Sequence, residues 1–425
     1  MTEAVPIGNA PTPTGCRKAL VRGGSAVFMA AFVAAILLLG HRAACITLGV
    51  FSVMIFRELL NVRYAKNLGK IANRVAHFRT VQWGWFAVAM HFAYGSDVAK
   101  APMSMLSVAS AALPERLHQP FGTAASLLDS SSPYHAFCSF LLYSAVFIIT
   151  VVSLRGTEAE LRFQITQLAW TIAACLLTVG QMKVSVFNAY SGLFWVVFPA
   201  LLVAVNDTGA YISGKSCGKR FVKRSFFPLS PNKTWEGFVG AALITCAAGF
   251  YLPTVLAKSG WLRCSFNELD ASGSCSTVST LYTPSATLAL PFVAIDDVER
   301  FGFGRIAPIQ VHGVVMALFA SLVAPFGGLF ASVVKRAYGL KDFDNIIPGH
   351  GGFMDRLDCQ MVMILFTYVY LTTFVAPRTA PGGGGGAHDS FAAILDALRQ
   401  HEPRTGDLEL LRAALENVAA AHSEL

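Results

Sequence analysis

The segment from Ser332 to Asp358 concentrates ionisable side chains in a pattern that suits phosphate chemistry. Its 27 residues include four cations, four carboxylates, one histidine and three glycines that follow a proline. The cations are Lys335, Arg336, Lys341 and Arg356, and the carboxylates are Asp342, Asp344, Asp355 and Asp358. Such a mixture suits a polyphosphate, because carboxylates can hold a divalent cation while that cation, Lys and Arg together neutralise phosphate oxygens.

Asp355 and Asp358 are three positions apart, so on a helix they share one face. At the start of a membrane-spanning helix, two carboxylates are unfavourable unless they bind a metal, cap the helix or pair with a cation. Gly351 and Gly352 would let backbone N–H groups approach a phosphate closely. The alternative interpretation is a solvated loop whose aspartates only cap the following helix.

A second polar segment starts at Asn206-Asp207 and runs to about residue 240. Asp207 emerges from a long apolar run and is a candidate metal ligand, while Lys233 is the cation of this segment most favoured for binding phosphate. The simpler interpretation is that these cations only set the membrane topology. Ser230-Pro-Asn-Lys-Thr followed by Glu236 also predicts the start of a helix.

The elements that must position these residues are membrane-spanning helices. The chain is 54% hydrophobic and only 14% charged, whereas a soluble domain has about a quarter charged residues, so a lipid environment is implied. A span needs about 20 mainly apolar residues. Nine runs approach this length, and they predict an all-α, polytopic integral membrane protein rather than a soluble helical one. The runs are 25–41, 44–60, 81–97, 134–153, 165–181, 185–205, 236–257, 311–330 and 359–376.

The first run follows Arg17, Lys18 and Arg22 and so resembles a signal peptide. Its length, the second run close behind it and the lack of a clear cleavage site favour an uncleaved helix.

Lys and Arg are concentrated in alternate gaps between these runs. Basic loops face the cytoplasm, so both polar segments are expected on the cytoplasmic side and the loops at 98–133 and 258–310 on the other side. A basic cytoplasmic face also suits anionic lipid or nucleotide. Because the basic residues lie between spans, nucleic acid is not an expected partner.

The nine cysteines include no C-x-x-C pair, so they do not indicate a zinc or redox motif. Cys264 and Cys275 share the loop predicted to be lumenal, where oxidation is permitted. A disulfide between them is predicted, with two free thiols as the alternative.

The chain is expected to have five parts. They are a cytoplasmic N-terminal segment at 1–24, transmembrane helices at 25–205 that include a spacer loop at 98–133, a catalytic transmembrane region at 206–376, a Gly-rich linker at 377–389 and an amphipathic helical tail at 390–425.

The pattern S-x-x-K-R-x-x-x-x-K-D followed by P-G-H-G-G-x-x-D-R-x-D, complete from Ser332 to Asp358, resembles the signature of phosphatidate cytidylyltransferases, also called CDP-diacylglycerol synthases. Further blocks are similar to the eukaryotic branch of that family. They are Ser230 to Phe238, Asp207 with Tyr211, Gln310-Val-His312, and Phe78-Arg79-Thr80 with Trp83-Gly-Trp85. The resemblance is dense from about 200 to 376 and patchy from 45 to 95, and the 98–133 loop and the glycine run depart from it.

The resemblance implies that CTP and phosphatidate react to give CDP-diacylglycerol and pyrophosphate. It implies CTP as co-substrate, Mg²⁺ as cofactor with Mn²⁺ as a substitute, and phosphatidate and membrane lipids as partners. A homodimer is left open. The resemblance to the eukaryotic branch favours the endoplasmic reticulum as the membrane.

Three groups of site residues are predicted on this basis. The catalytic group is Asp355, Asp358, Lys341, His350 and Arg356. The group that binds the phosphates of CTP or phosphatidate is Lys335, Arg336, Ser332, Lys233, Asn232, Gly351 and Gly352. The metal ligands are Asp207, Asp355 and Asp358, with Asp342 a weaker candidate. Arg57 and Glu58 are interpreted as a structural pair.

Two rival functions stay open on the sequence. A CTP-dependent polyprenol or dolichol kinase would transfer the γ-phosphoryl group instead and release CDP. A transporter would place charges near the middle of several spans, whereas the charges here gather at one edge. Enzymes that transfer CDP-alcohol headgroups are disfavoured, because their D-G-x-x-A-R motif is absent from the sequence.

Overall fold

The computed structural model describes residues 15–64, 78–99, 135–224, 233–266, 269, 275, 280–285, 288–290, 293–295, 305–349 and 351–375. The chain divides into two compact units, Met1–Val375 and Ala376–Leu425, and every described residue belongs to the first. The predicted linker at 377–389, the predicted tail at 390–425 and most of the 98–133 loop lie outside the described residues.

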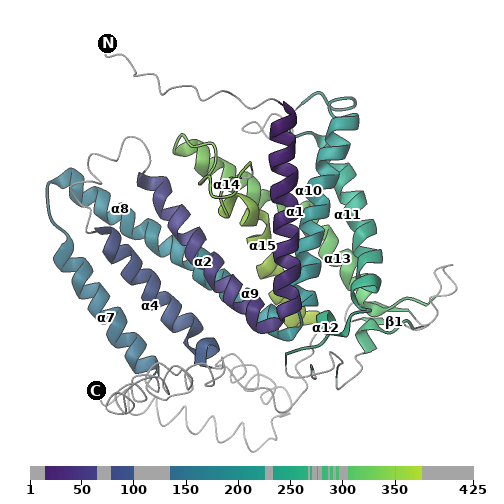
Figure 1. Ribbon diagram of the computed structural model, residues 1–425, viewed down its shortest axis with the longest axis horizontal. Helices are drawn as coiled ribbons and strands as arrows, with labels where there is room; N and C mark the ends of the chain where they lie inside the picture. Colours follow the sequence, from purple (N-terminus) through teal and green to yellow (C-terminus); the bar gives the residue numbers. More distant parts are fainter. Residues whose placement is uncertain are drawn as a thin grey trace, which may run out of the picture. The chain divides into compact units, whose positions relative to one another are not determined.

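Helices form almost all of the described unit (Figure 1), which confirms the predicted all-α class. The N-terminal half contains α1 (Gly15–Leu39), α2 (His41–Tyr64), α4 (Phe78–Ala99), α7 (His135–Ser153), α8 (Glu158–Cys175), the π-helical segment η2 (Leu176–Gly180) and α9 (Gln181–Ser191). The C-terminal half contains α10 (Phe194–Cys217), α11 (Trp235–Leu256), α12 (Gly260–Arg263), the 3₁₀ turn η3 (Thr280–Tyr282), α13 (Pro308–Leu322), α14 (Pro325–Ala337), α15 (Met354–Tyr370) and the π-helical segment η5 (Leu371–Val375). The small antiparallel pair β1 (Leu288–Leu290) and β2 (Val293–Ile295) belongs to a loop.

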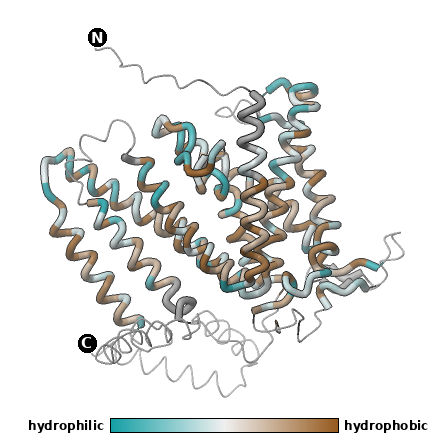
Figure 2. The backbone as a smooth tube through the Cα atoms, viewed as in Figure 1, coloured by the Kyte–Doolittle hydropathy of each residue, from teal (hydrophilic) through white to brown (hydrophobic). Residues whose placement is uncertain are grey.

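Seven helical segments of the described chain are long and apolar enough to cross a membrane. Figure 2 shows hydrophobic residues along the middle of these helices and hydrophilic residues near their ends. The apolar part of α1, Gly23–Leu39, is shorter, and α4 is not one of the seven. The integral membrane class is therefore confirmed, and the count of nine stays a prediction.

The predicted boundaries of the fifth and sixth spans, 165–181 and 185–205, are wrong. One continuous helical segment runs from Glu158 to Ser191, and α10 then begins at Phe194 and continues to Cys217. The helix ends at Gly192, whose φ of 139° is a conformation that other residues rarely adopt. A scan for apolar runs places the end of a span at the first polar residues that it meets. The backbone hydrogen bonds of α10 nevertheless continue beyond Asn206.

The predicted eighth span, 311–330, lies within Pro308–Ala337, a segment long and apolar enough to cross a membrane. It consists of two helices, α13 and α14, which meet at Val323 and Ala324. Pro325 is the first residue of α14, where its missing N–H leaves no helical hydrogen bond unmade.

Small residues bring α10, α11 and α13 into close contact. A Cβ at Gly313 would clash with the Gly249 carbonyl oxygen, and one at Gly209 would lie 3.3 Å from Cα of Ala241. Such contacts let helix backbones approach within a membrane, where association depends on packing. Asn206 on α10 lies buried at this contact and accepts a hydrogen bond from Thr245 on α11 at 3.4 Å.

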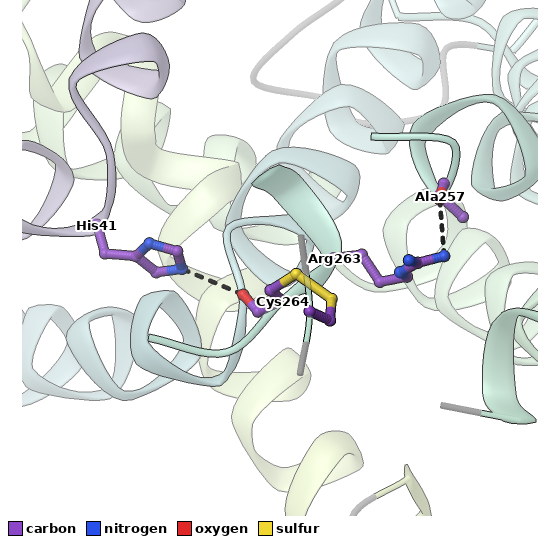
Figure 3. The surroundings of a disulfide bond; sticks show 5 residues. His41, Ala257, Arg263 and Cys264 are labelled. Atoms are coloured by element: carbon purple, nitrogen blue, oxygen red, sulfur yellow. Dashed lines mark hydrogen bonds between the residues drawn. A yellow bond between two sulfur atoms is a disulfide. The ribbon is translucent and has the colours of Figure 1, made fainter. Parts of the chain in front are cut away.

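The predicted disulfide between Cys264 and Cys275 is confirmed, with Cα atoms 5.3 Å apart. Figure 3 shows it beside His41, whose Nε2 lies 3.3 Å from the Cys264 carbonyl oxygen, and Arg263, which donates to the Ala257 carbonyl oxygen at 3.5 Å. This loop lies with α12 and β1 at one end of the helices, whereas α14 ends and α15 begins at the opposite end (Figure 1).

Candidate active site

The first part of the site forms where α14 ends and the chain turns back towards α15. Gly339 has a φ of 67°, and Leu340 N donates to the Lys335 carbonyl oxygen at 2.8 Å while Gly339 N donates to that of Arg336 at 3.0 Å. This is a Schellman ending, which glycine permits because it adopts left-handed conformations without strain. The ending leaves Lys335 and Arg336 in the last turn of α14, where cations are favoured by the helix dipole.

Lys335 and Asp355 form a buried ion pair that joins α14 to α15. Lys335 Nζ lies 2.6 Å from Asp355 Oδ1, and the two side chains are 12% and 5% exposed. Asp355 Oδ2 accepts hydrogen bonds from Phe343 N at 2.9 Å and from Gly352 N at 3.0 Å. Lys335 Nζ also lies 5.3 Å from the centre of the Phe343 ring. Asp355 therefore fixes a cation and two points of the intervening loop.

A second carboxylate, Glu58 on α2, caps the start of α15. Its Oε1 accepts from Phe353 N at 2.7 Å and its Oε2 accepts from Met354 N at 2.8 Å. Glu58 is fully buried, and a Cβ at Gly352 would lie 2.6 Å from its Oε2. The first N–H groups of a helix have no partners within it, so this carboxylate satisfies two of them and anchors α15 to α2.

The second part of the site is formed by residues of α10 and α15 together with Lys233, which lies just before α11 begins. Asp207 on α10 interacts electrostatically with Lys233, Arg356 and Asp358. Asp358 in turn interacts with Lys335, which connects the two parts of the site. Two carboxylates and three cations are thus gathered at the end of the helices where α15 begins. The two predicted segments, far apart in sequence, meet here.

The helices around Asp358 approach closely. A Cβ at Gly327 on α14 would lie 2.6 Å from the Asp358 carbonyl oxygen, and one at Gly328 would lie 3.4 Å from its Oδ2. Gln360 Nε2 donates to the Ala200 carbonyl oxygen at 3.1 Å, which ties α15 to α10. The position of Asp358 is therefore set by the close packing of α15 against α14 and α10.

The remaining predicted site residues differ in their hydrogen-bond partners and in their exposure. Ser332 Oγ donates to the Gly328 carbonyl oxygen at 2.8 Å, and Arg336 donates to that of Leu340 at 3.0 Å. Lys341 is exposed on the loop and Asp342 beside it is half-buried. His350 and Asn232 lie outside the described residues.

The glycines of the loop have internal partners for their N–H groups. Gly351 N donates to the Ile347 carbonyl oxygen at 3.1 Å, and Gly352 N donates to Asp355. Gly349 and Gly351 have φ of 75° and 84°, so glycine is needed there for the turn itself. The predicted donation of these N–H groups to a phosphate would require the loop to rearrange.

The carboxylates fit a magnesium ion only in part. Among the described residues, no group of three or more His, Cys, Asp or Glu side chains is placed to hold a metal. Mg²⁺ commonly uses one or two protein carboxylates and completes its shell with water and substrate phosphates, so a pair such as Asp207 and Asp358 would be enough to hold it. Asp355 fits less well, because Lys335 and two backbone N–H groups already engage its oxygens.

Two carboxylates outside the predicted site, Glu58 and Glu236, hold the surrounding backbone in place. No ion pair joins Arg57 to Glu58 in the described part of the chain, contrary to the predicted structural pair, and Glu58 caps α15 instead. Thr234 caps α11 by accepting from Gly237 N at 3.1 Å, which confirms the predicted helix start. The neighbouring Glu236 accepts from the N–H groups of Lys219, Phe221 and Val222 at 2.8–3.1 Å and so fixes the turn after α10.

Residues 20–374 match the cytidylyltransferase family. The chain belongs to the cytidylyltransferase family. The match covers both segments of the site and ends where the described helices end, so the family resemblance drawn from the sequence is confirmed.

Proteins similar to this chain come from distant eukaryotes. A probable phosphatidate cytidylyltransferase of Dictyostelium discoideum is 32% identical over 376 residues, which cover 86% of this chain and 72% of that protein. Phosphatidate cytidylyltransferase 1 of Arabidopsis thaliana is 32% identical over 360 residues, covering 85% of this chain and 80% of that protein. Phosphatidate cytidylyltransferase 1 of Homo sapiens is 34% identical over 362 residues, which cover 82% of this chain and 68% of that protein.

Proposed function

We propose that this chain transfers CMP from CTP to phosphatidate and releases pyrophosphate, producing CDP-diacylglycerol for phospholipid synthesis. The observation that carries the proposal is the meeting of Asp207 with Asp358, Lys233 and Arg356 at the edge of the membrane helices, in a chain whose family and named relatives share this chemistry. This pair of substrates needs both an apolar environment for the acyl chains and a charged edge for the phosphates.

The main catalytic demand is charge neutralisation. An oxygen of the phosphatidate phosphate attacks the α-phosphorus of CTP in line, the new P–O bond forms, and the bond to the pyrophosphate oxygen breaks. The nucleophile is already ionised near neutral pH, so no general base is required. Lys233 and Arg356 lie beside the two carboxylates and would hold phosphate oxygens of the two substrates close together despite their repulsion.

Asp207 and Asp358 are the residues that would hold Mg²⁺. When bound, the ion would supply positive charge to the phosphate oxygens as charge redistributes towards pyrophosphate. Asp355 is assigned a positioning role, because it holds Lys335 and the loop after α14. Lys341 and Arg336 are exposed nearby and are assigned to the triphosphate, and His350 stays a predicted phosphate contact.

We infer that the site faces the cytoplasm of an endoplasmic reticulum membrane, where CTP is available. Two independent features support this orientation. Lys and Arg are concentrated at the end of the helices where α15 begins, and the disulfide lies at the opposite end (Figure 1), which suits an oxidising lumen. A homodimer remains an expectation, which the mass of the purified protein in detergent would test.

A reconstituted assay tests the proposal. Purified protein in detergent micelles with CTP, phosphatidate and Mg²⁺ should form CDP-diacylglycerol, identified by mass spectrometry, and an equal amount of pyrophosphate. EDTA should abolish the reaction and Mg²⁺ or Mn²⁺ should restore it. Asp358→Asn serves as the matched inactive protein. Absence of liponucleotide from a folded, monodisperse preparation would contradict the proposal.

A further inference from the structure

The turn that follows α10 gathers positive charge on the surface of the chain. This basic turn, residues 218–224, contains four cations, Lys219, Arg220, Lys223 and Arg224. Lys215 in the last turn of α10 adds a fifth. All five are exposed, and among the described residues none of the five forms an ion pair. The sequence has no Asp or Glu between Asp207 and Glu236, so this charge is not balanced locally.

The basic turn lies at the end of a membrane-spanning helix, on the side of the candidate active site. α10 begins beside the disulfide loop, where a Cβ at Gly192 would lie 3.1 Å from the Arg263 carbonyl oxygen, and it ends at the opposite side (Figure 1). The residues of the turn therefore lie where the apolar part of the chain gives way to the polar part. This is the depth of the lipid headgroups in a membrane.

Aromatic side chains are exposed beside these cations. Phe221 in the basic turn is 80% exposed, and Tyr211 on α10 and Trp235 at the start of α11 are 67% and 42% exposed. Lys215 Nζ lies 5.8 Å from the centre of the Tyr211 ring. Aromatic rings at the headgroup level, together with cations that meet lipid phosphates, are typical of protein surfaces at the edge of a bilayer.

Glu236 on α11 fixes the backbone of the basic turn. Its carboxylate accepts hydrogen bonds from Lys219 N at 3.1 Å, Phe221 N at 2.9 Å and Val222 N at 2.8 Å. Lys219 adopts a φ of 62°, a left-handed conformation that is uncommon outside glycine. Because Glu236 belongs to a membrane-spanning helix, it ties the turn to the membrane edge while the Phe221 ring stays exposed.

These features ask for more than a topology signal. Setting the topology requires positive charge, but neither an exposed phenylalanine nor a fixed backbone. A soluble phosphate would neutralise the cations and leave the Phe221 ring in water. A phospholipid with an anionic headgroup satisfies both, because its phosphate and its acyl chains belong to one molecule and meet at this depth.

We propose that the basic turn binds the headgroups of anionic phospholipids in the leaflet that the candidate active site faces. Cations of the turn contact the lipid phosphates, and Phe221 inserts its ring at the boundary between headgroups and acyl chains. Several cations near an anionic membrane surface act together, so the surface prefers anionic over zwitterionic lipid. The proposal does not depend on the proposed catalytic function.

A fluorescent dye on Cys217 tests the proposal beside the turn itself. Cys217 is exposed at the end of α10, whereas the other free cysteines of the described chain are buried or half-buried. The full-length chain with Cys16→Ser is labelled and placed in phosphatidylcholine vesicles. Phosphatidylglycerol or phosphatidylcholine with a spin label on its acyl chain is then added as the quencher. Half-maximal quenching should need about fivefold less phosphatidylglycerol than phosphatidylcholine. Equal quenching by the two lipids overturns the proposal.

Two pairs of substitutions with the same loss of charge make the test specific. Arg220→Gln with Lys223→Gln spares the N–H groups that bond Glu236 and should reduce the preference to about twofold or less. Arg155→Gln with Arg162→Gln changes exposed residues around the start of α8, at the same end of the helices (Figure 1), and should keep the full preference. An unchanged preference in the first pair, or an equal loss in both pairs, overturns the proposal.

Two further measurements test the ring and the source of the phosphate. Phe221→Ser should increase quenching of the dye by aqueous acrylamide, and unchanged quenching would contradict the insertion of the ring. Saturating CTP or pyrophosphate, added without Mg²⁺, should leave the preference for phosphatidylglycerol unchanged. Loss of the preference on adding either would show that the turn binds a soluble phosphate, and would overturn the proposal.

Discussion

At the scale of single residues, the aspartates of the α15 start have different surroundings and so should have different roles. Asp355 is 5% exposed and is bonded to Lys335 and two backbone N–H groups. Asp358 accepts a hydrogen bond from the N–H of its neighbour Cys359, and it interacts electrostatically with Asp207. Sequence spacing placed both on one helix face, but it could not show that Asp355 alone forms an ion pair with Lys335.

Asp355→Asn should reduce both stability and activity. The substitution leaves the buried Lys335 without its counter-charge, and breaking a buried ion pair on one side costs about 3–5 kcal/mol. Thermal unfolding in detergent should therefore shift down, kcat should fall, and the Mg²⁺ concentration needed for half-maximal activity should stay unchanged. Unchanged stability with a raised Mg²⁺ requirement would make Asp355 a metal ligand instead.

Asp358→Asn should lower turnover and change the Mg²⁺ requirement, with little effect on stability. Loss of a ligand to the catalytic ion should lower turnover on the order of a thousandfold, which corresponds to about 4 kcal/mol of transition-state stabilisation. The Mg²⁺ requirement should rise and the unfolding temperature should change little. Near-normal turnover in this variant would remove Asp358 from the metal site.

At the scale of elements, the site depends on how α2, α10 and α14 hold the start of α15. The motif around Ser332–Asp358 and the start of α11 could be predicted from sequence, because each is a local pattern. The role of Glu58 could not, because its partner Phe353 is 295 positions away in the chain. The position of Asp207 inside α10 was also missed, since a polar residue within a span looks like its end when only hydropathy is considered.

Glu58→Ala should destabilise the start of α15. The substitution leaves the N–H groups of Phe353 and Met354 buried without an acceptor, at about 1–3 kcal/mol for each. Unfolding temperature and kcat should both fall, and Glu58→Gln, which keeps one acceptor oxygen, should recover part of both. Arg57→Ala is the matched control at an exposed neighbouring position and should behave like the parent. Equal effects of Arg57→Ala and Glu58→Ala would favour the pairing of these two residues instead.

In the whole molecule, the candidate site and the disulfide lie at opposite ends of the helices and should therefore face opposite sides of the membrane. Leu269→Thr creates a glycosylation sequon at Asn267 in the disulfide loop, while Asn232-Lys-Thr234 is a natural sequon on the site side. In microsomes, Asn267 of the variant should acquire a glycan that a glycosidase removes, and Asn232 should not. A glycan on Asn232 would reverse the orientation.

The tail beyond Val375 belongs to a separate unit and lies outside the family match. None of the predicted site residues is in it. Truncation after Thr379 should therefore leave turnover of the purified protein within about a few-fold of the parent, a change of less than about 1.4 kcal/mol in transition-state stabilisation. Loss of activity in a truncated protein that stays monodisperse in detergent would mean that the tail helps to form the site.

The central claim, that this chain transfers a nucleotidyl group to phosphatidate, is tested most directly by following two labels. The purified protein is given phosphatidate and CTP labelled either at the α-phosphorus or at the γ-phosphorus. The α-label should enter the lipid and the γ-label should leave in pyrophosphate, and both transfers should stop in Asp358→Asn. Entry of the γ-label into lipid, with release of CDP, would show a CTP-dependent lipid kinase and would contradict the account.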